Sequence, residues 1–91
     1  MDICNKIIDF LYIGDKNAPI AYGDQFDLIV NCTPTVPFPK ICKKCIRISV
    51  LDLTLHNEKF YNEIIKNKIL EQIHEKIINN QNVLVHCSIS Y

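Results

Sequence analysis

An evenly spaced stripe of apolar residues, followed at once by a short apolar run, constrains the fold of this chain most strongly. Residues 58–78 are predicted to form one helix, with Asn57 as its N-cap, because apolar side chains recur every four positions along one face. The polar stretch 79–82 suits the end of that helix, and the apolar run 83–85 predicts a strand buried on both faces. A helix that leads into such a strand indicates parallel pairing and an α/β fold. The stripe consists of Tyr61, Ile65, Ile69, Ile73 and Ile77, with Leu70 beside it.

The rest of the chain supplies further strands and one rigid loop. Residues 7–13 predict a strand, or a strand pair with a bend near Asp9, and residues 26–32 predict a second buried strand. Residues 18–25 are mixed and favour a helical turn at most. Alternation over residues 46–51 predicts a strand with Ile46, Ile48 and Val50 on one side. Between these strands stands a loop with three prolines, Pro34, Pro37 and Pro39.

Length and charge exclude several classes of protein. With 91 residues, the chain has room for a single domain. Its 10 basic and 10 acidic residues balance, which argues against nucleic acid or an anionic membrane as a partner. Two glycines are too few for a glycine-rich nucleotide-binding loop. No apolar run approaches the length of a membrane span, and no signal peptide is apparent.

The cysteines predict a reducing environment. Five occur, an odd number, and with no export signal we expect reduced thiols in a cytoplasmic protein rather than a disulfide framework. The pair Cys42 and Cys45 has the spacing of a metal or redox motif, but it lacks the second pair that a zinc site needs, so a plain turn before the strand at Ile46 is favoured. The sequence Asn31-Cys32-Thr33 matches a glycosylation pattern, yet it lies in a predicted strand of a chain without an export signal.

The residues best placed for chemistry follow the last predicted strand. Cys87 stands just past its carboxyl end, the edge at which open α/β sheets bind ligands. Backbone N–H groups in such a loop can hold an anion and stabilise a thiolate nucleophile. The alternative is that Cys87 is a small buried apolar residue at a strand end.

Several segments, in order along nearly the whole chain, resemble the dual-specificity branch of the cysteine-based protein phosphatases. Residues 83–87, Val-Leu-Val-His-Cys, resemble the start of the signature loop, in which His-Cys is followed by five residues and an arginine. Residues 11–14 (Leu-Tyr-Ile-Gly) and 28–33 (Leu-Ile-Val-Asn-Cys-Thr) are similar to two early strand motifs. Residues 47–52 (Arg-Ile-Ser-Val-Leu-Asp) are similar to the strand that ends in the general-acid aspartate. The resemblance implies a mixed, partly parallel sheet with flanking helices, in which the strand 83–85 is central.

The resemblance also implies a role for each matching residue. Cys87 would be the nucleophile, Asp52 the general acid and then base, and His86 a support of the loop that lowers the pKa of the cysteine. The substrate would be phosphotyrosine in proteins, with phosphoserine and phosphothreonine as further candidates, and no cofactor or metal is implied. Without the resemblance, Asp52 would be read as a turn or N-cap residue. The backbone N–H groups of the phosphate cradle would come from Ser88, Ile89, Ser90 and Tyr91.

Two departures from the family pattern bear on activity. Position 90 holds Ser90 where the family has glycine, and the family arginine would fall at position 93, past Tyr91. We therefore expect a single incomplete domain over residues 1–91, without its C-terminal helices and with impaired turnover, because the arginine binds the phosphate oxygens through two hydrogen bonds. The alternatives are a pseudophosphatase that binds a phosphorylated or acidic partner, or an inactive remnant.

The basic residues around the loop have a plain and a functional interpretation. Lys40, Lys43, Lys44 and Arg47 form a small basic cluster that suits a phosphorylated substrate, although a solvated loop is the simpler account. His74 is expected to be a solvated helix residue. The oligomeric state is left open by the sequence.

Overall fold

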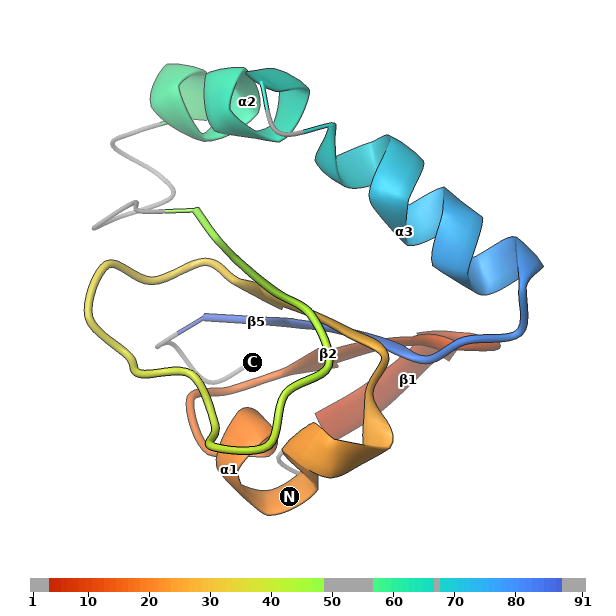
Figure 1. Cartoon of the computed structure of the whole chain (residues 1–91). Helices are drawn as coiled ribbons and strands as arrows, with labels where there is room; N and C mark the ends of the chain where they lie inside the picture. The colour runs from red at the N-terminus through yellow and green to blue at the C-terminus, as the bar shows by residue number, and fades with distance from the viewer. Residues whose placement is uncertain (1–3, 49–56, 67, 88–91) are drawn as a thin grey trace.

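The computed structural model describes residues 4–48, 57–66 and 68–87, and it shows a five-stranded mixed sheet with helices on both faces (Figure 1). The strands lie in the order β1-β2-β5-β3-β4. β5 pairs in parallel with β2 and β3, β4 pairs in parallel with β3, and β1 pairs antiparallel with β2. The predicted α/β class, the parallel pairing and the central place of the last strand are confirmed. The strand bounds are β1 Cys4–Ile8, β2 Leu11–Gly14, β3 Leu28–Asn31, β4 Cys45–Arg47 and β5 Val83–His86.

The first apolar stretch forms the hairpin that its composition suggested. β1 and β2 are joined by a two-residue turn at Asp9 and Phe10, where Phe10 has a φ of 71°. After β2, the short helix α1 (Ala18–Tyr22) begins with Pro19 in its first turn, and a 3-10 helix, η1 (Gly23–Gln25), follows directly. This segment is thus more helical than the single turn predicted for residues 18–25.

The single helix predicted over residues 58–78 is wrong, because the segment forms two helices. α2 spans Asn57–Lys66 and α3 spans Ile69–Ile78, and between them Lys68 adopts the left-handed conformation with a φ of 52°. The break changes which side chains face the sheet. Ile69 is buried, whereas Tyr61 and Ile65 of the predicted stripe are largely exposed, and Ile64 of α2 packs against the core instead.

The two faces of the sheet carry separate apolar clusters, because side chains alternate along each strand. α2 and α3 lie over one face and α1 over the other (Figure 1). The α2–α3 face buries Leu28, Val30, Cys32, Ile48, Ile69, Val83 and Cys87. The α1 face buries Ala18, Phe26, Ile29 and Leu84. Ile46 also packs on the α2–α3 face, so the predicted alignment of Ile46 with Ile48 is confirmed, whereas Val50 lies outside the described residues.

The amino ends of β3 and β5 are joined through a reciprocal contact. The backbone N–H of Asn82 donates to Asp27 Oδ2 at 2.8 Å, and the carbonyl of Asn82 accepts from the N–H groups of Asp27 and Leu28. Lys43 Nζ lies 3.0 Å from Asp27 Oδ1, and its hydrogen bond lowers the pKa of that carboxyl. Asn80, at the end of α3, has a φ of 58°, which confirms that an asparagine supplies the left-handed residue in place of glycine.

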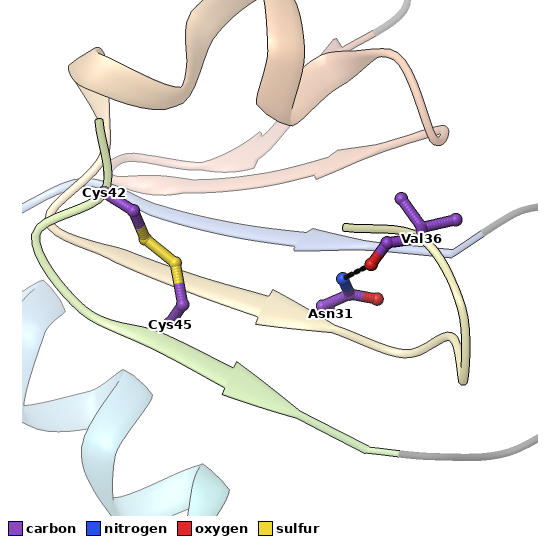
Figure 2. The surroundings of a disulfide bond; sticks show 4 residues. All are labelled: Asn31, Val36, Cys42 and Cys45. Atoms are coloured by element: carbon purple, nitrogen blue, oxygen red, sulfur yellow. Dashed lines mark hydrogen bonds between the residues drawn. A yellow bond between two sulfur atoms is a disulfide. The ribbon is translucent and has the colours of Figure 1, made fainter. Parts of the chain in front are cut away.

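Cys42 and Cys45 form a disulfide at the start of β4 (Figure 2). The expectation that all the cysteines are thiols is therefore wrong for this pair. The residues between them, Lys43 and Lys44, make a tight turn, and the carbonyl of Lys44 accepts a hydrogen bond from the N–H of Ile29. The turn favoured by the sequence is thus present and is closed by a covalent bond. Among the helices that the structure describes, none has the length and apolar character needed to cross a membrane.

Candidate functional site

Cys87 follows the last residue of the central strand, at the edge where the parallel strands β2, β3 and β5 have their carboxyl ends. Its side chain is only 6% exposed and belongs to the apolar cluster of the α2–α3 face. Both sequence-based interpretations of Cys87 remain consistent with this position. The residue stands at the ligand-binding edge of the sheet, and its side chain is also packed as a small apolar group.

Cys32 lies in the same cluster as Cys87, at the end of the neighbouring strand. Its backbone N–H donates to the carbonyl of His86 at 2.8 Å. Burial raises the pKa of the Cys32 thiol to about 12, and the negative charge that Cys87 would carry as a thiolate adds to the effect. Cys32 therefore stays protonated at neutral pH.

A row of residues crosses the carboxyl ends of four strands on the α1 face. Gly14, His86, Asn31 and Arg47 are successive cross-strand partners in β2, β5, β3 and β4. The sequence singled out His86 as a site residue and Arg47 as part of a basic cluster. It gave no sign that Asn31 would stand between them, because that depends on the register of the strands.

The imidazole of His86 is enclosed within this row, with 1% of the residue exposed. The pKa of His86 is lowered to about 4, with burial as the main cause. The charge of Arg47 also lowers this pKa, whereas the nearby backbone of Cys87 and the charge of Asp15 raise it. Within the part of the chain that the structure describes, neither ring nitrogen has a hydrogen-bond partner. At neutral pH the ring is uncharged, so it does not stabilise a thiolate at Cys87 through a positive charge.

Asn31 organises the loop that follows β3. Its Oδ1 accepts from the backbone N–H and the hydroxyl of Thr33, at 3.0 and 2.6 Å. Its Nδ2 donates to the carbonyl of Val36 at 2.8 Å (Figure 2). Thr33 Oγ1 in turn accepts from the N–H of Val36 at 3.0 Å. The Asn31 side chain is fully buried, so a glycan could not be attached to it in this fold.

Arg47 completes the network from β4. Its guanidinium donates from Nη1 to the carbonyl of Thr33 and from Nη2 to the carbonyl of Val36, both at 2.8 Å. Phe38 lies over the same guanidinium, with the ring centroid 4.7 Å from Cζ. Arg47 is therefore a structural member of the candidate site rather than a solvated residue of the basic cluster. The loop 33–38, although irregular, is held in one position against the carboxyl ends of β3 and β4.

Several predicted site residues lie outside the described residues, namely Asp52, Ser88, Ile89, Ser90 and Tyr91. The structure thus brings together Cys87 and His86 at one edge of the sheet and adds Asn31 and Arg47 beside them. In the described ranges, no group of three or more His, Cys, Asp or Glu side chains is arranged to hold a metal ion.

Solved structures of similar shape identify the fold. One is a mouse protein assigned as a dual specificity phosphatase, in complex with zinc tungstate; it superposes with a TM-score of 0.70 and 19% identity over 97% of this chain. The chain has the fold of a dual specificity phosphatase. Human DUSP28 gives a TM-score of 0.67 with 18% identity, again over 97% of this chain. The resemblance inferred from the sequence motifs is thereby confirmed at the level of the fold.

These similarities cover part of each solved structure. The chain spans 56% of the mouse protein and 61% of DUSP28. No family model and no curated protein sequence matches the chain. The assignment of the fold therefore rests on structural similarity and on the order of the motifs. Any chemistry follows from the residues of the site themselves.

Proposed function

We propose that the chain is a dual-specificity-type protein phosphatase domain that uses Cys87 to hydrolyse phosphotyrosine, and also phosphoserine and phosphothreonine, in proteins. The observation that carries this proposal is the place of Cys87 in a dual specificity phosphatase fold, directly after the central parallel strand. Residues 1–91 are proposed to belong to a single, incomplete domain of this type, whose partners are phosphoproteins.

The proposed reaction has two steps. The thiolate of Cys87 attacks the phosphorus, the bond to the leaving oxygen breaks, and Asp52 protonates that oxygen. Asp52 then removes a proton from water, which attacks the phosphorus and releases phosphate from the sulfur. The N–H groups of Ser88, Ile89, Ser90 and Tyr91 hold the phosphate oxygens, and the uncharged His86 supports the loop.

A second candidate function is a binding module that holds a phosphorylated or acidic partner without turnover. It is favoured by the burial of the Cys87 side chain in an apolar cluster and by Ser90 in place of the family glycine. In addition, Arg47, the single arginine of these 91 residues, is engaged with the loop 33–38 and is therefore not placed to hold a phosphate. We therefore propose that turnover by these 91 residues is impaired.

One set of assays separates the two candidates. Hydrolysis of para-nitrophenyl phosphate and binding of a fluorescent phosphotyrosine peptide are measured for the wild type, Cys87→Ser and Cys4→Ser, the last being a control at a half-buried cysteine in β1. A phosphatase shows slow, vanadate-sensitive hydrolysis that Cys87→Ser abolishes and Cys4→Ser preserves. Asp52→Asn then lowers the rate by about 100-fold or more.

The other outcomes are equally informative. Phosphate-dependent peptide binding without any hydrolysis would establish the binding module. If the chain neither hydrolyses the ester nor distinguishes the phosphorylated peptide from its unmodified form, both candidates are rejected.

A further inference from the structure

A groove of about 570 Å³ lies on the surface between the α1–η1 segment and the end of the proline-rich loop. In Figure 1 this loop passes alongside α1. Most of the lining is apolar, and two of its isoleucines are strongly exposed, Ile20 at 72% and Ile41 at 70%. An exposed apolar hollow of this kind is typical of a place where another molecule binds. Ile20, Phe38, Pro39 and Ile41 provide its main apolar surfaces.

The groove is held open by rigid contacts between its two walls. Gly23 lies so close to Pro39 that a Cβ atom at position 23 would stand 2.9 Å from Pro39 Cγ. Pro19 on one wall and Pro39 on the other have fixed φ angles. The groove is therefore preformed, and a ligand would not have to order it.

The loop wall of the groove carries a positive charge that suits an acidic group, whereas the η1 wall carries the negative charge of Asp24. Lys40 and Asp24 line it, and the loop continues through Lys43 and Lys44. Lys43 pairs with Asp27, whereas among the described residues neither Lys40 nor Lys44 forms an ion pair. The loop wall of the groove thus carries Lys40 next to an apolar surface, and Lys44 follows four residues further along the loop.

The groove also adjoins the candidate site through a shared residue. Phe38 lines the groove and covers the guanidinium of Arg47, and Arg47 belongs to the row that contains His86. The contact between Phe38 and Arg47 therefore connects the groove to the row at the carboxyl ends of the strands.

We propose that this groove is a recognition subsite that binds an apolar side chain of a phosphoprotein segment, with an acidic neighbour of that side chain directed to Lys40. The proposal rests on the proposed function, since it assumes that a phosphorylated residue binds beside it. It assigns to Lys40 of the basic cluster a role in selecting substrates or partners rather than in catalysis.

The test uses fluorescent peptides in anisotropy titrations with the full chain. The probe peptides contain phosphotyrosine, glutamates and a leucine that is moved stepwise along the peptide, and each has a partner in which serine replaces the leucine. Burying a leucine side chain is expected to tighten binding at the best position by about tenfold or more. Ile41→Asp should remove that preference, and Ile78→Asp, at a similarly exposed isoleucine of α3, should retain it.

Unphosphorylated versions of the same peptides separate this proposal from the proposed function. A leucine preference combined with equal affinity for the phosphorylated and unphosphorylated peptides supports the groove and counts against the phosphate site. Phosphate-dependent binding with no leucine preference at any position overturns the subsite and leaves the proposed function intact. Sedimentation of the wild type and Ile41→Asp tests whether a second copy of the chain occupies the groove instead. If the wild type is a dimer that Ile41→Asp dissociates, the groove binds another copy of the chain and the proposal is wrong.

Discussion

At the scale of single residues, burial decides which groups near Cys87 carry charge. His86 is enclosed and uncharged at neutral pH, and Cys32 is held as a thiol. The guanidinium of Arg47 donates to two carbonyls and is covered by Phe38. The sequence identified His86 and Cys87 because they stand together in a recognisable motif. Asn31 stands in a glycosylation pattern and in a strand motif of the resembled family, but neither pattern places it between His86 and Arg47. That position depends on cross-strand register, which no local pattern reveals.

The lowered pKa of His86 predicts how stability depends on pH. Because the pKa is about 4 in the folded chain and about 6.5 when unfolded, the unfolded state binds more protons between these values, and folding weakens as pH falls from about 6.5 to 4. The loss is at most about 3 kcal/mol. Urea unfolding across this pH range should show the slope in the wild type and in His74→Gln, and a flatter dependence in His86→Gln.

A direct titration provides a check that needs no variant. The ring resonances of His86, followed by NMR from neutral pH downward, should show no protonation near pH 6.5. A midpoint there would contradict the buried, uncharged state of the ring.

At the scale of elements, the strands were easier to predict than the helices. Consecutive apolar residues mark β3 and β5, and alternation marks β4, so each strand is recognisable on its own. The division between α2 and α3 was missed because no glycine or proline stands between residues 58 and 78. The four-residue spacing of apolar side chains was compatible with one helix. The break instead goes with tertiary packing, in which Ile64 of α2 and Ile69 of α3 both pack in the cluster of the α2–α3 face.

The left-handed conformation of Lys68 predicts a stabilising substitution. A Cβ atom is unfavourable at this φ, whereas glycine adopts it readily, so Lys68→Gly should raise the free energy of unfolding by up to about 1 kcal/mol. The gain is partly offset by the greater freedom of glycine in the unfolded chain. Lys68→Ala is the matched control, because it keeps the Cβ and should bring no such gain. Equal effects of the two substitutions in urea unfolding would show that the backbone at position 68 is not strained.

At the scale of the whole molecule, β5 connects the two halves of the sheet. It lies between β2 and β3, which do not pair with each other, so in the described sheet the strand pairing that links the hairpin to the β3–β4 unit passes through β5. The sequence predicted that this strand is central and parallel to its neighbours, on the strength of the preceding helix and the family resemblance. It did not predict that β2, a strand of the first hairpin, would be one of those neighbours.

This arrangement predicts that Leu84 is critical for folding. It is fully buried in the middle of β5, so Leu84→Ala should lower the free energy of unfolding by about 2–5 kcal/mol, a large share of the total for a domain of this size. Ile78→Ala, at an exposed position of α3, should change it by about 0.5 kcal/mol or less. Circular dichroism during thermal unfolding measures both. A small loss for Leu84→Ala would contradict the central role of β5.

The central place of β5 has a further consequence for synthesis on the ribosome. Its partner strands, β2 and β3, lie more than fifty residues earlier in the chain, so they are synthesised before β5 and remain unpaired with it until it emerges. Until residues 83–86 emerge, β2 and β3 each present an unpaired edge, of the kind that chaperones bind and that promotes aggregation. The residues that place Cys87 at the sheet edge are thus also the ones that join the sheet, so the nascent chain acquires its candidate site and closes its sheet in the same event.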